Sequence, residues 1–212
     1  MKHIFSIIFI VFFSACSSMY YGAWEKFGVE KKDILKRRVV SARDAQEDSR
    51  AEFKDALTRL REAYPLKETE LSKVYERLKS SYESSENSSE NLRKRIDDMH
   101  TVATDLFDEW KEEAEQIQTL NLKSQSLKQR TDAIDRYKSM KLSLVSSYDK
   151  TRPVLAKLKD YVLFLKHNLN AQAIGSLGNE SANIQEEIER LISRMQESIK
   201  ETESFISSLE ER

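Results

Sequence analysis

The stretch that decides the fold runs from Leu71 to Trp110 and reads LSKVYERLKSSYESSENSSENLRKRIDDMHTVATDLFDEW. Its apolar and small residues recur at alternating steps of four and three: Leu71, Tyr75, Leu78, Tyr82, Ser85, Ser89, Leu92, Ile96, Met99, Ala103, Leu106 and Trp110. Such a stripe lies along one face of a long helix and is typical of helices wound against each other. Ser84–Ser89 has the composition of a linker, but the spacing continues through it. We therefore expect an unbroken helix with a thin polar waist, with a turn as the alternative.

The scarcity of glycine and proline argues against a β-protein. The 212-residue chain has four glycines and two prolines, and no glycine lies between Gly28 and Gly175. Two-residue β-hairpins need residues with positive φ, chiefly glycine, at turn after turn. Because this chain cannot supply those turns, we predict an all-α protein.

Composition and charge indicate a folded protein with a solvated surface. Hydrophobic residues make up 39% of the chain and charged residues 33%, which is too apolar for a disordered protein. The formal net charge is −1, and basic and acidic residues alternate along the chain. This balance predicts no nucleic-acid partner.

Further apolar stripes predict a bundle. We expect four helices, near 22–63, 67–119, 122–174 and 180–211. The hairpin between the second and third helices is placed around Thr119–Lys123, and one continuous helix as far as Pro153 is the alternative. Pro153 should kink or restart the third helix, because proline lacks a backbone N–H.

Two segments near the C-terminus complete this prediction. Tyr161–Leu165 is apolar throughout, so we expect it to be surrounded in the core of the bundle. The segment 175–179 contains two glycines and is expected to be a loop. The predicted fold is an elongated antiparallel bundle of about four long helices with coiled-coil-like packing, forming a single domain over residues 22–212.

The N-terminus has the features of an export signal. A short positive stretch precedes the apolar run Ile4–Phe13, which is about half the twenty residues that span a bilayer. Ser14-Ala15-Cys16 then resembles the bacterial lipobox, in which a cysteine behind small residues is lipidated; that pattern usually has leucine where Phe13 stands. The resemblance implies a cleaved lipoprotein signal peptide over residues 1–15 and a lipidated tether over residues 16–21. Cys16, the single cysteine, would then be the membrane anchor.

The residue after the cysteine bears on localisation. Ser17, rather than aspartate, follows Cys16. In Gram-negative lipoproteins such a residue implies export to the outer membrane, so the resemblance predicts a cell-envelope protein that faces the periplasm.

Residue patterns for catalysis are absent from the sequence. After removal of the signal peptide, the histidines are His100 and His167. Asp97 and His100 have the i, i+3 spacing used in di-metal helical bundles, but such sites need a second pair, and none exists here. The pair is therefore interpreted as a solvated contact on a helix flank. Glycine-rich phosphate loops and nucleophile turns are also missing, so we predict no enzyme, no cofactor and no metal site.

Three ordered motifs resemble a known family. They are Lys32-Asp33-Ile34-Leu35 with Ala42-Arg43-Asp44-Ala45-Gln46, then Leu106-Phe107-Asp108-Glu109-Trp110, and then Val162-Leu163-Phe164-Leu165-Lys166-His167-Asn168-Leu169-Asn170-Ala171. Together they are similar to the bacterial lipoprotein family catalogued as domain of unknown function 2959, over nearly the whole chain from about Tyr20. The resemblance implies a helical envelope protein, and it transfers no site residues because the family's function is uncharacterised. We expect the polar motif residues to make interhelical contacts or a partner surface: Arg43, Asp44, Asp108, Lys166, His167 and Asn168.

The sequence thus favours a non-enzymatic, lipid-anchored helical scaffold or partner-binding module. Its partners would be the membrane, through Cys16, and an envelope protein or a second copy of the chain. The alternatives are a bundle that binds a small ligand or metal ion between its helices, and a membrane-active helical protein.

Overall fold

The computed structural model describes residues 31–62, 71–168 and 171–210, and every secondary-structure element in this part of the chain is a helix. The helices are α2 (Lys31–Glu62), α3 (Leu71–Gln116), α4 (Leu120–Asp149), α5 (Thr151–His167) and α6 (Ala171–Glu210). The prediction of an all-α protein is confirmed. The signal peptide, the tether and the predicted helix starts at 22 and 67 lie outside the described residues.

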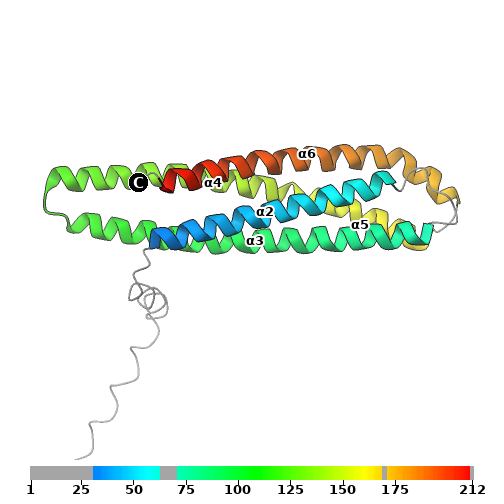
Figure 1. Cartoon of the computed structure of the whole chain (residues 1–212), viewed down its shortest axis with the longest axis horizontal. Coiled ribbons are helices and arrows are strands. Elements are labelled where there is room, and N and C mark those ends of the chain that lie inside the picture. The colour runs from blue at the N-terminus through cyan, green and yellow to red at the C-terminus, as the bar shows by residue number, and fades with distance from the viewer. Residues whose placement is uncertain (1–30, 63–70, 169–170, 211–212) are drawn as a thin grey trace, which may run out of the picture.

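The helices pack as an elongated bundle with four columns (Figure 1). Helices α4 and α5 follow each other and together form one column, which packs against α3 and α6. Helix α2 packs against the same two helices and forms its most extensive interface with α3. The chain direction alternates from column to column, as predicted for an antiparallel bundle.

The stripe of α3 faces the core along the whole helix. Of its twelve residues, eight are buried and four, Tyr75, Tyr82, Leu106 and Trp110, pack partly buried against the core. Helix α3 continues through Ser84–Ser89, so the polar waist is confirmed and the alternative of a turn is wrong. Small buried side chains such as Ser85 let a neighbouring helix come close.

The hairpin after α3 lies slightly earlier than predicted. Helix α3 ends at Gln116 and α4 begins at Leu120, so the turn occupies 117–119 rather than Thr119–Lys123. The alternative of one continuous helix to Pro153 is wrong. The predicted restart at Pro153 is confirmed, because the column breaks at Lys150 and Pro153 falls in the first turn of α5, where a missing N–H costs no helical hydrogen bond.

The predicted loop at 175–179 is wrong. Helix α6 begins at Ala171 and continues through Gly175 and Gly178, while α5 ends at His167 instead of 174. Each glycine costs a helix only about 1 kcal/mol relative to alanine, which the packing of a 40-residue helix offsets. The turn lies instead next to Asn168, whose Nδ2 donates to the Phe164 carbonyl oxygen (3.0 Å) and satisfies an otherwise unpaired helix end.

The apolar segment Tyr161–Leu165 is only partly surrounded. Tyr161, Val162 and Leu165 are buried, but Leu163 is 45% exposed. The expectation of burial on all sides is therefore wrong. The reason is that α5 lies mainly against α3 and α6, so one side of the helix faces solvent.

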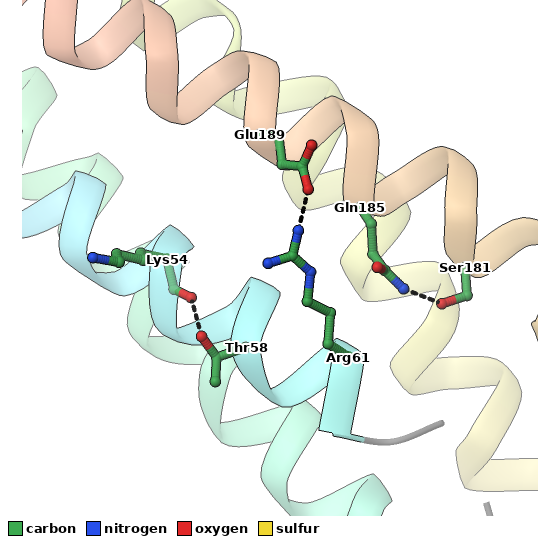
Figure 2. A network of polar contacts seen from close by, with 6 residues as sticks. All are labelled: Lys54, Thr58, Arg61, Ser181, Gln185 and Glu189. Atoms are coloured by element: carbon green, nitrogen blue, oxygen red, sulfur yellow. Dashed lines mark hydrogen bonds and ion pairs between the residues drawn. The ribbon is translucent and has the colours of Figure 1, made fainter. Parts of the chain in front are cut away.

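An ion pair closes the bundle near the end of α2. Arg61 of α2 pairs with Glu189 of α6 (Figure 2). The other two hydrogen bonds drawn in Figure 2 lie within single helices, from Thr58 to the Lys54 carbonyl oxygen and from Gln185 to Ser181. Because Arg61 and Glu189 are both about half exposed, their pair contributes at most about 1 kcal/mol.

Candidate functional site at the base of a helical arm

Helices α3 and α4 extend beyond the rest of the bundle as a two-helix arm (Figure 1). We define the arm as residues 111–128. The first residue of α2, Lys31, pairs with Glu109 of α3 (2.6 Å) at the base of the arm. Near the end of α6, Leu209 lines a cavity together with Trp110. Beyond this level α3 and α4 mainly contact each other, and Ala114 is the only buried residue of the arm.

The motif Leu106–Trp110 forms the base of the arm. Phe107 is buried and packs edge-on against Tyr137 of α4, with ring centroids 5.7 Å apart. Trp110 donates from Nε1 to Ser126 Oγ (3.0 Å), which joins α3 to α4. The apolar spacing of the sequence predicts that this part of α3 faces a neighbouring helix. The hydrogen bond to Ser126 is seen only in the structure.

Arg130 of α4 holds the base from the other side. Its Nε donates to the Phe107 carbonyl oxygen (2.6 Å), and its Nη2 lies 3.9 Å from Asp108 Oδ1. The hydrogen bond is charge-assisted and largely shielded, so it should outweigh the ion pair, whose carboxylate is mostly exposed.

An aromatic cluster lies next to the base inside the body. Tyr137 contacts Phe107, Phe205 of α6 (6.2 Å between centroids) and His100 (6.4 Å, stacked). Burial raises the pKa of the Tyr137 hydroxyl, because the phenolate is poorly solvated there. Burial and then the nearby Lys141 lower the pKa of His100, while Asp97 opposes this shift.

Asp97 and His100 each contact another side chain. Asp97 pairs with Arg93 (3.1 Å), and His100 Nδ1 lies 3.4 Å from the Tyr137 hydroxyl on α4. Within the residues that the structure describes, no three His, Cys, Asp or Glu side chains are grouped so as to hold a metal ion.

A partly open cavity of about 520 Å³ lies at the base of the arm. Aromatic and aliphatic walls come from three helices, with Phe107 and Trp110 from α3, Phe205 and Leu209 from α6, and Ala133 from α4. Two cationic side chains, Lys32 and Arg136, stand at the same cavity. The site therefore combines apolar walls with positive charge.

A family model described as protein of unknown function DUF2959 matches residues 20–209. The chain belongs to this family. The match spans both the bundle and the arm, and it confirms the resemblance inferred from the three motifs. No curated protein matches the chain, and neither does any solved structure.

The polar motif residues of this family member do not converge on one site. Arg43 and Asp44 of α2 pair with each other (2.7 Å). Asp108 lies at the base of the arm, whereas Lys166 and His167 are exposed in the last turn of α5, at the far end of the bundle.

The contacts at the base of the arm depend on residues that the periodicity does not single out. Arg130, Ser126 and Lys31 hold the motif of this DUF2959 chain in place. The sequence gives little indication that these three residues make interhelical contacts, because they are polar and lie outside the apolar stripes. Cys16 lies outside the described residues, and none of the described helices has a stretch long and apolar enough to cross a bilayer.

Proposed function

We propose that the protein is a non-enzymatic lipoprotein of the cell envelope that acts as an elongated scaffold between a membrane and a partner. The observation that carries the proposal is the position of Lys31. This residue begins α2 beside Glu109, at the base of the arm, so a lipid on Cys16 would attach the bundle near one of its ends. At 1.5 Å per residue, α3 alone extends about 70 Å away from that end.

The N-terminal sequence supports the anchor. Ser14-Ala15-Cys16 follows an apolar run that is too short to span a bilayer, and Cys16 has no second cysteine with which to form a disulfide. Ser17 favours the outer membrane, with the bundle in the periplasm. Acyl chains add about 0.8 kcal/mol of membrane affinity for each buried CH₂ group.

The far end of the bundle is the proposed partner surface. Lys166 and His167 are exposed in the last turn of α5 and make a cationic and polar patch next to the Asn168 cap. Cations are favourable at a helix C-terminus, yet both side chains remain accessible to a partner. An acidic helix or loop of another envelope protein would complement this patch.

The substitution Cys16→Ser tests the anchor. We expect the variant to leave the membrane fraction and to keep the helical circular dichroism and melting temperature of the wild type, because position 16 precedes the described bundle. Ser17→Ala, which preserves the cysteine, is the matched control and should remain in the membrane fraction. Retention of Cys16→Ser on membranes after a high-salt wash would contradict the proposal.

A test of the partner surface uses Lys166→Ala with His167→Ala. In-cell crosslinking of the wild type should capture an envelope protein through α5, and the double substitution should weaken that product without changing thermal stability. Lys94→Ala, an exposed lysine in the middle of α3, is the matched control. An unchanged crosslinked product in the double variant would place the partner elsewhere.

The cavity at the base of the arm favours a second candidate, the binding of a small amphipathic anion. Its apolar walls would cover a hydrocarbon group, and Lys32 and Arg136 would face the negative charge. Native mass spectrometry of the purified protein should then detect a bound anion that Arg136→Gln releases. A ligand-free wild type that also fails to bind added fatty acid would eliminate this candidate.

A further inference from the structure

The tip of the arm exposes apolar side chains. Leu120 is 82% exposed and Leu122 is 54% exposed, and both lie at the start of α4 directly after the turn. The other large exposed apolar residues of the described helices, Leu142 and Leu163, lie singly on the body of the bundle. Single exposed leucines are common on protein surfaces, but these two lie within one helical turn at the end of a projecting hairpin, and we call this pair the tip.

The same segment contains no carboxylate. From Gln116 to Thr131, sixteen consecutive residues include no aspartate or glutamate, although these make up 36 of the 212 residues, about one in six. The polar residues there are amides, hydroxyls and the cations Lys123, Lys128 and Arg130. Arg130 is engaged at the base of the arm, and the nearest carboxylates, Glu112, Glu113 and Glu115, come before the turn on α3. The turn and the start of α4 therefore combine exposed leucines with Lys123 and Lys128, a combination that suits the phosphate-rich surface of a bilayer.

Polar contacts fix the tip to the arm. Lys123 Nζ donates to the Glu115 carbonyl oxygen (2.8 Å) across the turn, and Gln118 Nε2 donates to the Gln116 carbonyl oxygen (3.2 Å). These bonds occupy carbonyl groups at the end of α3 that have no helical partner. These bonds hold the start of α4, which carries Leu120 and Leu122, against the end of α3.

The length of the N-terminal segment allows the tip and the anchor to reach one surface. Lys31 lies beside Glu109, and the seven steps from Glu109 to Gln116 rise about 10 Å along α3. Fourteen residues lie between Cys16 and Lys31, and the fifteen steps of an extended chain span at most about 50 Å. A lipid on Cys16 can therefore lie in the same bilayer that the tip touches.

We infer that the arm is a second membrane contact, with Leu120 and Leu122 inserted into the headgroup region of the bilayer that holds the Cys16 lipid. The inference rests on the proposed lipid anchor. Two leucines bury too little apolar surface to hold the protein alone, but the anchor keeps them close to the surface at a high effective concentration. The double attachment would orient the bundle and direct the α5 end away from the membrane.

The lone cysteine of the chain makes a direct test possible. Because a lipidated Cys16 does not react with maleimide, Leu120→Cys introduces a unique site for an environment-sensitive dye in the full-length lipoprotein. The protein is reconstituted into vesicles of phosphatidylethanolamine and phosphatidylglycerol that carry a quencher at headgroup depth. Leu142→Cys is the matched control, since Leu142 is 69% exposed on the same helix but lies on the body.

We expect about threefold greater quenching of the dye at position 120 than at position 142, with a blue-shifted emission at 120 only. Adding Leu122→Glu to Leu120→Cys should return the dye to a water-like emission. Equal quenching at positions 120 and 142 in lipidated protein would overturn the tip contact and leave the anchor standing.

Two further results would overturn the inference. A Cys16 thiol that mass spectrometry shows to be unmodified would overturn the anchor and, with it, the tip contact. A dye at 120 that is shielded without vesicles, increasingly so at higher protein concentration, would assign the tip to a second copy of the chain and overturn the inference.

Discussion

Tyr137 and Gln46 are buried residues that carry polar groups into the core of the bundle. Tyr137 of α4 is buried between rings of α3 and α6, with its hydroxyl close to His100. Gln46 of α2 is fully buried and donates from Nε2 to Ser147 Oγ of α4 (2.5 Å). The residues His100 and Gln46 each lead to a measurable prediction.

His100 should make the protein less stable in mild acid. Partial desolvation of its largely exposed ring, and then the nearby Lys141, hold the pKa of His100 below the ordinary value of 6.5, so the folded state binds a proton less readily than the unfolded state. The contribution to stability is full above pH 6.5 and is lost as the pH falls through the lower pKa of the folded state. His100→Gln should therefore reduce the loss of unfolding free energy between pH 7 and pH 5, measured by urea denaturation.

Lys141→Gln provides the control for this pH effect, because Lys141 is the second cause of the lowered pKa. It should weaken the pH dependence without abolishing it. A His100 pKa above 6.5 in an NMR titration of the folded protein would contradict the expected sign.

Gln46→Met should stabilise the protein by roughly 1 kcal/mol. Among the described residues, Gln46 Oε1 is buried without a hydrogen-bond partner, whereas Ser147 Oγ also donates to the Leu144 carbonyl oxygen and stays satisfied in the variant. Methionine has nearly the same shape and removes the unpaired acceptor, which costs about 1–3 kcal/mol when buried. The midpoint of urea unfolding measures the change.

Gln46→Ala separates polarity from packing. It removes the same amide but leaves a cavity, so it should destabilise the fold by about 2 kcal/mol. Equal destabilisation by methionine and alanine would show that the amide of Gln46 is fully satisfied in the native protein.

Helix α3 combines two environments in one continuous element. Over most of its length it packs against α2 and against the α4–α5 column, whereas among the described helices only α4 lies beside its last turns. The arm therefore depends on a few polar bonds at its base, chiefly those made by Arg130 and Trp110. Local stability should be lower in the arm than in the body.

Arg130→Met should loosen the arm selectively. It removes the hydrogen bond to the Phe107 carbonyl oxygen but keeps an unbranched apolar side chain. Amide hydrogen exchange over residues 111–128 should accelerate about tenfold, as expected for the loss of a bond of 1–1.5 kcal/mol, while exchange in α2 stays unchanged. Arg190→Met, which removes an exposed pair with Glu186 within α6, is the control and should leave the arm unaffected. Uniform acceleration throughout the molecule would contradict a local role.

The molecule as a whole has two different ends. The arm, the start of α2 and the cavity lie at one end, and the α5–α6 turn lies at the other. This polarity underlies the proposal of a scaffold anchored near the arm with a partner at the far end. A symmetric bundle of the same helices would offer no such orientation.

Much of the fold follows from the sequence alone. The stripe from Leu71 to Trp110 determined that α3 is a long amphipathic helix, because a four-and-three spacing buries one face whatever the neighbours are. The shortage of glycine determined the all-α class. The same spacing also predicted that α3 continues through Ser84–Ser89, although the composition of that segment is typical of a linker.

The tertiary structure decided where the helices end and which of them have neighbours. Gly175 and Gly178 resemble a loop, but each local preference is worth only about 1 kcal/mol, and packing along α6 outweighs it. The arm exists because α2 begins and α6 ends short of the α3–α4 turn, a mismatch of lengths that periodicity does not encode. Arg130 meets Phe107 and Asp108 only because the chain reverses at 117–119, so the base of the arm is a product of the folded structure.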